Sequence, residues 1–279
     1  MSMPTVSSLR RYPVKSMAGE ELASIETTPN GFRGDRAYAL VDTATGKVGS
    51  AKGVKRFGEL LKWRAEFVAE PADGGAVPAV RITAPGGASF ESDASDASAA
   101  LKAAFGASVA LSSSPPQGLL LEFAAGTLGG KHADTTELPL AGATPGTFFD
   151  LSAVHLVTTA TLRRLQEANQ GTKVDVDRFR PNLVVDTGDE SGFVENDWAG
   201  RTLHIGEDAV VRVTIACPRC VMPTLARSDL AAEPKLIRMI AAHNLVDLGD
   251  FGRLPCVGVY ADVVKPGRIK LGDRIRIAD

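Results

Sequence analysis

Short apolar runs alternate with turn-forming residues along most of the chain, and this pattern predicts many short strands rather than long helices. The strands expected in the first third cover residues 6–14, 24–28, 37–41, 65–69 and 79–83. An Ala-rich segment, residues 95–105, is followed by Gly106, which predicts a short helix with a glycine stop. Several short strands at regular spacing are typical of a small β-barrel or sandwich.

The second part of the chain shows the same strand pattern with two helices added. Its expected strands cover residues 154–157, 183–186, 202–206, 210–216 and 256–264, and the chain closes with residues 269–273 and a last strand. Helical patterns cover residues 160–169 and 234–243. The Ser- and Pro-rich residues 112–118 predict a linker, so we expect two domains, 1–118 and 119–279. The predicted fold class is mainly β with a few helices (α+β).

The strand-like run at 210–216 leads into the sequence Cys-Pro-Arg-Cys at 217–220. Five of the six residues 210–215 are β-branched, which favours a strand. Pro218 lacks a backbone N–H and keeps Cys217 extended, so the strand is expected to end there. The strand would deliver two thiols, with Arg219 between them, to a loop. A nearby guanidinium favours ionisation of a thiol to the thiolate, which is a soft metal ligand and a nucleophile. The arrangement therefore indicates metal binding or catalysis.

Three simpler interpretations of these cysteines stay open. A Cys is often a small buried hydrophobe. A structural zinc site usually takes two such cysteine pairs, whereas only Cys256 is left here and the four His are scattered. A thioredoxin-like redox pair would stand at a helix start beside a βαβ pattern, and residues 221–224 do not form a helix-opening sequence.

Composition narrows the class of protein. With 279 residues, 44% hydrophobic and 23% charged, the chain has the composition of a globular protein with a proper core. A net charge of −2 gives no electrostatic case for binding nucleic acid or an anionic membrane. Three Cys make no disulfide framework, which favours a cytoplasmic location. We expect neither a signal peptide nor a membrane span, because no long apolar run occurs.

Polar and cationic residues recur where the expected strands end and loops or helices begin. They are Lys15, Ser16, Arg36, Thr158, Thr159, Arg180, Asn182 and Arg219. Such places commonly hold small anions, and Arg can grip a phosphate with two parallel hydrogen bonds. Taken singly, an Arg is usually a solvated charge and a Thr pair before a helix is usually a cap. Spacing alone does not assemble these residues into one site.

Five short motifs then occur in one order along the chain, at residues 12–16, 34–36, 178–182, 217–224 and 266–273. Together they resemble the MOSC proteins, named for the C-terminal domain of molybdenum cofactor sulfurase. The similarity is greatest to members with an N-terminal MOSC β-barrel domain, such as the mitochondrial amidoxime-reducing component. The resemblance implies a small N-terminal β-barrel domain plus a MOSC β-barrel domain. It also implies a molybdenum cofactor (molybdopterin) held between them.

The resemblance assigns roles to individual residues. In the amidoxime-reducing relatives the second Cys of the Cys-x-Arg-Cys stretch ligates molybdenum, and that position is Cys220. Thr224 falls on the substrate side, so Cys220 and Thr224 are the expected catalytic residues. Relatives usually carry two Thr in a row after the Cys, whereas residues 222–224 here are Met-Pro-Thr. The positions matching the family's phosphate and pterin contacts are Lys15, Ser16, Arg36, Thr158, Thr159, Arg180, Asn182 and Arg219.

The resemblance therefore predicts a molybdenum-dependent oxidoreductase that reduces N-hydroxylated or other N-oxygenated small molecules. Three Cys cannot supply the four thiolates of a plant-type iron–sulfur cluster, and no nucleotide fingerprint offers a flavin or NAD site. The electrons are therefore expected from a separate reductase. The alternative is a carrier of the cofactor or of sulfur, with a persulfide on Cys220. The lack of a pyridoxal-phosphate domain argues against a complete sulfurase but not against such a carrier.

Overall fold

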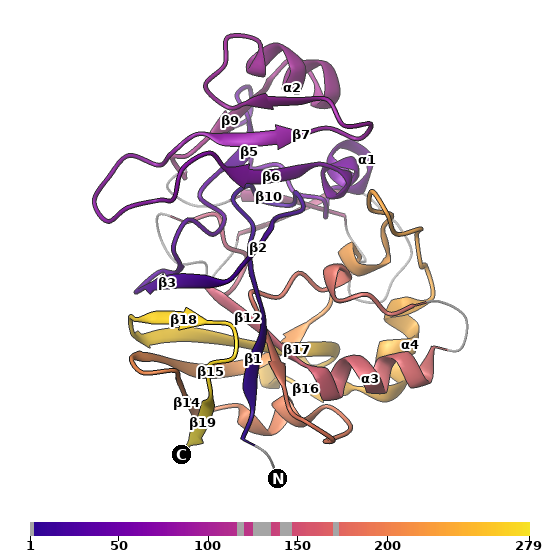
Figure 1. The fold of residues 1–279 in the computed structure, drawn as a ribbon. Coiled ribbons are helices and arrows are strands. Elements are labelled where there is room, and N and C mark those ends of the chain that lie inside the picture. Colours follow the sequence, from indigo (N-terminus) through magenta and orange to yellow (C-terminus); the bar gives the residue numbers. More distant parts are fainter. Residues whose placement is uncertain (1–2, 116–119, 125–134, 140–146, 170–172) are drawn as a thin grey trace.

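The computed structural model describes residues 3–115, 120–124, 135–139, 147–169 and 173–279. Figure 1 shows much of the N-terminal part of the chain stacked above a layered C-terminal part that carries two helices on one side. Strands dominate the element order, as the short apolar runs predict. The fold is α+β and mainly strand, which confirms the predicted fold class.

The largest sheet has nine strands in the order β19-β14-β15-β17-β12-β13-β1-β2, with β16 paired to β17. The bounds are β1 (Thr5–Arg11), β2 (Glu20–Leu22), β12 (Val154–Thr158), β13 (Leu183–Asp186), β14 (Thr202–Ile205), β15 (Ala209–Pro218), β16 (Leu245–Asp247), β17 (Arg253–Lys265) and β19 (Ile275–Ala278). Most neighbours run antiparallel, but β12 and β13 are parallel. A parallel pair needs a crossover, which α3 (Thr159–Ala168) provides.

N-terminal strands complete the C-terminal part of the molecule, since β1 and β2 belong to the large sheet and β3 (Ser24–Thr28) pairs with β18 (Arg268–Lys270). β1 pairs with β13, with Leu9 opposite Leu183. β3, which also pairs with β4 (Gly31–Phe32), lies beside β18. These strands therefore contribute buried side chains, such as Leu9 and Ile25, to the core of the large sheet. The boundary near residue 118 lies outside the described residues, so the division into 1–118 and 119–279 stays a prediction.

The rest of the N-terminal part has a core of its own. Leu40, Phe57 and Leu101 are buried in it. Its strands pair as β5–β9 and β6–β7–β8, and β10 pairs with β11. The bounds are β5 (Ala39–Asp42), β6 (Arg64–Phe67), β7 (Val80–Thr83), β8 (Ser89–Glu91), β9 (Val109–Ser112), β10 (Leu120–Ala124), β11 (Thr135–Pro139), α1 (Val54–Phe57) and α2 (Ala97–Phe105). The Ala-rich helix predicted at 95–105 is therefore confirmed.

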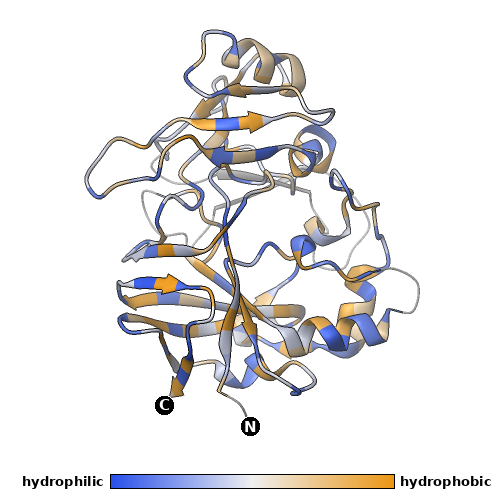
Figure 2. Ribbon diagram, viewed as in Figure 1, coloured by the Kyte–Doolittle hydropathy of each residue, from blue (hydrophilic) through white to orange (hydrophobic). Residues whose placement is uncertain are grey.

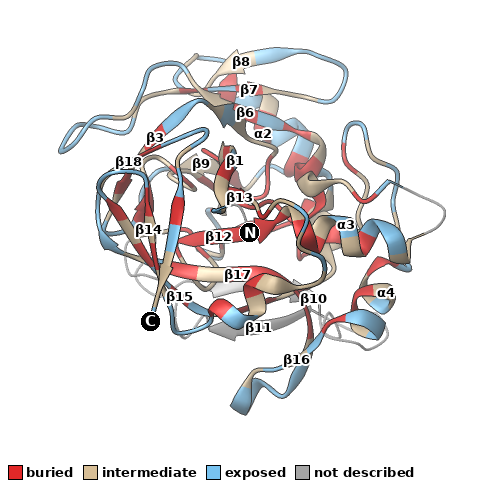
Figure 3. Ribbon diagram, turned by 60° about the horizontal axis from the view of Figure 1, so that its bottom comes forward, coloured by how far each residue is buried: buried red, intermediate tan, exposed pale blue. Residues whose placement is uncertain are grey.

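A third core lies beneath α3 and α4 (Leu236–His243). Leu165, Leu236 and Ile240 are buried there against Val157 and Val257 of the sheet. Figure 2 shows the mixed hydropathy of both helices, and Figure 3 shows buried residues concentrated along β12 and β17. The short 3-10 helices are η1 (Gly58–Lys62), η2 (Val176–Arg178), η3 (Val194–Trp198), η4 (Met222–Thr224) and η5 (Gly249–Phe251). Within the described part of the chain, no helix is long and apolar enough to cross a bilayer.

Candidate functional site

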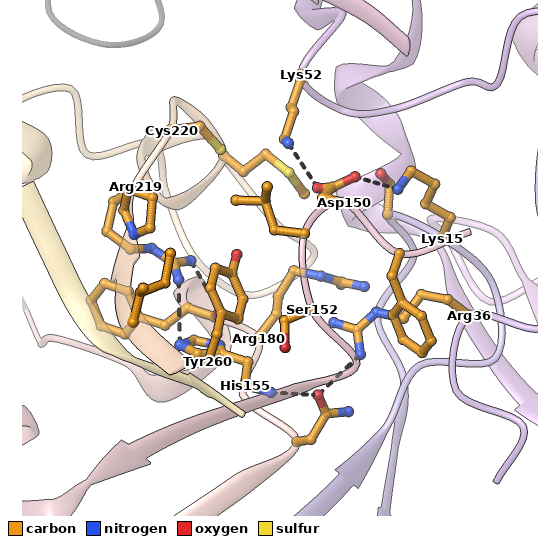
Figure 4. Close-up of a pocket in the computed structure, with 18 of the residues that line it drawn as sticks. Lys15, Arg36, Lys52, Asp150, Ser152, His155, Arg180, Arg219, Cys220 and Tyr260 are labelled. Carbon is orange, nitrogen blue, oxygen red and sulfur yellow. Dashed lines mark hydrogen bonds and ion pairs between the residues drawn. The ribbon is translucent and has the colours of Figure 1, made fainter. Parts of the chain in front are cut away.

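A cavity of about 500 Å³ lies where β12, β15, β17 and the segment after β1 meet loops of the N-terminal part (Figure 4). That volume suits a small molecule or cofactor. Seven of the ten residues predicted from sequence line it: Lys15, Ser16, Arg36, Arg180, Asn182, Arg219 and Cys220. Residues up to 245 positions apart, from Lys15 to Tyr260, thus meet in one place.

β15 delivers Cys220 to this cavity, as the β-branched run predicts. The strand reaches Pro218, which lies opposite Cys256 of β17. The backbone N–H of Arg219 then donates a hydrogen bond to the Pro255 carbonyl at 2.8 Å. This bond anchors the start of the loop, and the partly exposed Cys220 thiol lines the cavity. Its accessibility distinguishes it from Cys256, which is fully buried in β17.

The cavity lining carries an excess of positive charge. Its cationic side chains are Lys15, Arg36, Lys52, Arg180 and Arg219, and its carboxylate is Asp150. Asp150 bonds the Lys15 ammonium and lies 2.7 Å from the Lys52 ammonium, as Figure 4 shows. Burial opposes ionisation of Asp150, but the two ammonium groups outweigh it and hold its pKa below the ordinary value. Five cations facing one carboxylate favour an anionic ligand.

The aromatic ring of Tyr12 supports two of these cations. The guanidinium carbon of Arg36 lies 4.6 Å from the ring centroid, and that of Arg180 lies 4.2 Å from it. The Tyr12 hydroxyl donates to the Pro181 carbonyl at 3.1 Å, and its backbone N–H donates to Asp35 at 2.8 Å. One buried ring therefore orients both guanidinium groups.

Three cavity residues have backbone conformations that favour glycine. Ser16, Arg36 and Arg180 have φ values of 67°, 48° and 55°, and they are the non-glycine residues with positive φ in the described chain. The left-handed conformation costs a residue with a Cβ roughly 1–2 kcal/mol. Because all three line one cavity, this strain is concentrated where side chains must be aimed at a ligand.

Arg180 keeps unused hydrogen-bonding capacity. Its Nη1 donates to the Met17 carbonyl at 2.5 Å, whereas its Nη2 is buried without a partner in the described chain. Burial and the neighbouring Arg36 lower the pKa of Arg180 to about 9. An orphaned donor on a buried cation is costly by itself, so this group indicates a missing acceptor, such as an anion in the cavity.

The side chains of Asn182 and Ser16 form hydrogen bonds between separate segments around the cavity. The Asn182 side-chain carbonyl accepts from the His155 backbone N–H at 3.1 Å and from Arg36 at 3.3 Å. Its amide donates to Asp35 at 2.9 Å. The Ser16 hydroxyl accepts from the backbone N–H of Ala51 at 3.0 Å. Both polar side chains therefore join segments that are distant in sequence.

The guanidinium of Arg219 lies against buried groups of the protein itself. Its guanidinium contacts the Cys217 sulfur at 2.9 Å, the Phe179 carbonyl at 3.0 Å and His155 Nε2 at 3.5 Å. Only its Nε is buried without a partner in the described chain. Arg219 therefore braces the loop that carries Cys220, and Cys217 is a packed partner of that brace with no exposed surface.

His155 and Tyr260 form what we call the inner wall of the cavity, and both are uncharged at neutral pH. Burial, together with Arg219, lowers the pKa of His155 to about 3, so its imidazole is neutral. Burial also raises the pKa of the Tyr260 hydroxyl above its ordinary value, and Cys217 adds to this effect. The charge of the site thus resides on the lysines, the arginines and Asp150.

Thr158 and Thr159 lie outside the cavity lining. Thr158 caps α3 by accepting from the backbone N–H of Thr161, which confirms the predicted cap. Its hydroxyl donates to the buried Glu195 at 2.6 Å, and that of Thr159 donates to Asp186 at 3.1 Å. Two carboxylates already occupy this helix N-terminus. The predicted role of both Thr residues in cofactor binding stays a prediction.

Thr224 also lies outside the lining. Its hydroxyl donates to the Val221 carbonyl at 2.7 Å, which closes the turn of η4. The preceding Met222 lines the cavity instead. The catalytic role predicted for Thr224 has no support in this geometry and stays a prediction.

Sequence reasoning missed several lining residues. They are Lys52, Asp150, Ser152, His155 and Tyr260. Lys52 and Asp150 lie in loops without periodicity, and His155 and Tyr260 lie within strands whose pattern indicates only burial. The neighbouring Ser50–Lys52 and Asp150–Ser152 positions are polar, but that signal is too common to mark a site.

Two family models match the chain. The MOSC domain matches residues 144–276, and the MOSC N-terminal beta barrel domain matches residues 3–113. The chain belongs to the MOSC family. This agrees with the five motifs, four of which lie around the cavity or the loops that build it.

Curated relatives of this MOSC protein include amidoxime-reducing components. It is 32% identical over 130 residues to mitochondrial amidoxime reducing component 2 of Bos taurus, covering 45% of this chain and 37% of that protein. It is 27% identical over 132 residues to mitochondrial amidoxime-reducing component 1 of Homo sapiens, covering 46% and 37%. The chain therefore aligns with little more than a third of the length of these relatives.

Solved structures similar to this MOSC protein are more distant. The YuaD protein of Bacillus subtilis gives a TM-score of 0.46 at 11% identity, covering 99% of this chain and 96% of that one. YiiM of Geobacillus stearothermophilus gives a TM-score of 0.33 at 16% identity, covering 46% and 55%.

Proposed function

We propose that this MOSC protein binds a molybdenum cofactor in the cavity and reduces N-oxygenated small molecules with electrons from a separate reductase. The observation that carries the proposal is the placement of the Cys220 thiol on the wall of a strongly cationic cavity. The names of the curated relatives, which are amidoxime-reducing components, support the substrate class.

The cavity residues fit such a cofactor by their chemistry. A thiolate is a soft ligand suited to a metal of this kind, and Cys220 offers one. The cofactor's phosphate needs cations, and Lys15, Lys52 and Arg36 line the same cavity. The unpartnered Nη2 of Arg180 is a donor that an anion would satisfy.

When bound, the cofactor would supply two-electron redox chemistry that the side chains cannot perform. Reduction of an N-hydroxylated compound breaks the N–O bond, consumes two electrons and two protons, and releases water. The chain's own residues would bind and orient. Cys220 would hold the metal, and the cationic side chains would hold the phosphate.

The protons for this reduction would not come from the inner wall of the cavity. Burial and Arg219 lower the pKa of His155 to about 3, so at neutral pH its imidazole is neutral and does not act as an imidazolium acid. Burial raises the pKa of the Tyr260 hydroxyl, which makes it a weaker acid than an exposed tyrosine. We therefore propose that water at the cavity mouth supplies the protons. A cytoplasmic location, expected from the three free cysteines, also stays a prediction.

The test is metal and pterin content in protein produced by a host that makes the cofactor. We expect about one molybdenum per chain in the wild type and at least a tenfold loss in Cys220→Ala, because the thiolate ligand is removed. Cys256→Ala is the matched control, since Cys256 is buried and does not line the cavity. It should keep the metal.

Absence of both molybdenum and pterin from the wild type would contradict the proposal, as would equal molybdenum in Cys220→Ala. Transferable sulfur found on Cys220 in metal-free protein would instead favour the carrier alternative. Metal-loaded protein would then be assayed with N-hydroxylated amidines and an added reductase.

A further inference from the structure

The cavity lining also contains apolar side chains that the proposed cofactor contacts do not use. They include Ile215, Met222, Leu248, Phe251 and Leu254. A cofactor phosphate and pterin need the cationic side chains, so they leave these apolar side chains for another part of a ligand. Apolar side chains that line a cavity bind the apolar parts of small molecules.

Three of these residues, Leu248, Phe251 and Leu254, lie in a hairpin that is hydrogen-bonded to the loop carrying Cys220. β16 and β17 form a hairpin, with Val246 opposite Leu254. The residue after Leu254 is Pro255, whose carbonyl accepts the hydrogen bond from the Arg219 backbone at 2.8 Å. The hairpin is thus bonded directly beside Cys220. The lysines and Arg36 come from the N-terminal part of the chain.

Phe251 stands at the rim of the cavity and is unusually exposed. Its relative exposure of 68% is the largest among the exposed large hydrophobic residues of the described chain, and it is the aromatic member of that set. The others are Met3, Val68, Val77, Leu245, Val264 and Leu271, and none of them lines the cavity. An exposed ring at a cavity mouth gains from covering an apolar ligand.

Two glycines present this ring. Gly249 and Gly252 have φ values of 64° and 70°, and they lie on either side of Asp250 and Phe251. The Leu248 N–H donates to the Gly252 carbonyl at 3.0 Å, so the turn is closed. Figure 3 shows the segment at β16 projecting from the body of the molecule in exposed colour. The turn therefore holds Phe251 out from the core and beside the cavity.

We infer that Phe251, with Leu248 and Leu254, binds the apolar substituent of the substrate. This side chain therefore selects N-oxygenated compounds that carry an aromatic or bulky apolar group. The inference rests on the proposed function for the reaction, but the binding of the apolar group is a property of the hairpin alone.

The test compares two substrates with the same reacting group, benzamidoxime with a phenyl substituent and acetamidoxime with a methyl substituent. We expect Phe251→Ala to lower kcat/KM for benzamidoxime about tenfold, mainly through KM, and to leave acetamidoxime within twofold. Phe251→Leu should give a kcat/KM for benzamidoxime between the values of the wild type and of Phe251→Ala. Val264→Ala is the matched control, since Val264 is 60% exposed on β17 but lies outside the cavity lining.

A second readout separates this inference from the proposed reaction. Binding of benzamide, which is neutral and carries the phenyl group but no N–O bond, is measured by calorimetry on the protein as purified. Weaker binding to Phe251→Ala, without turnover in any variant, would keep the inference and remove the proposed reaction. Equal losses for both amidoximes, or unchanged benzamide binding in Phe251→Ala, would overturn the inference. So would a wild type that neither binds benzamide nor prefers benzamidoxime.

Discussion

Tyr12 shows how much one buried side chain contributes to the charge pattern of the cavity. Two guanidinium groups, of Arg36 and Arg180, stack on its ring and repel one another. Without the ring, each guanidinium group would need water or another partner in its place. The ring is 4% exposed, so it also excludes the water that would otherwise screen these charges.

We expect Tyr12→Leu to reduce the pterin content of purified protein roughly thirtyfold, since the two cations on the ring contribute about 1 kcal/mol each. Tyr12→Phe keeps the ring and should retain pterin, losing only the hydrogen bond to Pro181. Pterin is measured by fluorescence after oxidation, and urea unfolding of both variants checks that the fold is intact. Wild-type pterin content in a folded Tyr12→Leu protein would refute the role assigned to the ring.

At the scale of elements, the first turn of α3 has its threonine hydroxyls already bonded within the protein. Thr158 and Thr161 both donate to Glu195, whose pKa is raised by burial despite these hydrogen bonds. Asp186 accepts from Thr159. These hydroxyls are therefore not available to donate to a phosphate without giving up their carboxyl partners.

Thr158→Ala should therefore lower the free energy of unfolding by about 1 kcal/mol or more, because it removes a helix cap and one donor to Glu195. It should leave the pterin content unchanged. Urea unfolding and pterin analysis of the same preparation measure both effects. A large pterin loss with little change in stability would restore the cofactor-binding role predicted from sequence.

The strands and helices were accessible to sequence reasoning to different degrees. The β-branched run before Cys217 and the apolar face of α4 each carry a periodic signal that tertiary packing does not override. Most cationic lining residues were found because they follow strand ends in family-like motifs. Lys52 and Asp150 were missed because they lie in loops without periodicity, and they meet only after the fold brings residues 52 and 150 together. The pairing of β3 with β18 was missed because a strand pattern does not name its partner.

At the scale of the whole molecule, the N-terminal strands make the two halves of the chain interdependent. Leu9 and Ile25 are buried in the core of the large sheet beside residues from β12 to β19. Removing β1 would leave β13 without one of its two neighbours. A fragment without these strands would expose apolar side chains and unpaired backbone groups.

We therefore expect the fragment 119–279 to show no cooperative thermal transition when it is produced alone. The full chain, cleaved between residues 118 and 119 after folding, is the matched control and should keep a single transition, because β1 and β3 remain in place. Circular dichroism during heating measures both. Cooperative melting of the isolated fragment would contradict the interdependence and support a separable C-terminal domain.

The pairing of β3 with β18 also bears on how the chain folds during translation. Glu26 and Arg268, which form an ion pair at 2.6 Å across these strands, are 242 positions apart. The ribosome must therefore make almost all of the intervening sequence before β3 meets its neighbour, and contacts of such long range form slowly. Until then the edge of β3 that pairs with β18 is open to other partners, so we expect a chaperone that covers nascent chains to raise the yield of folded protein.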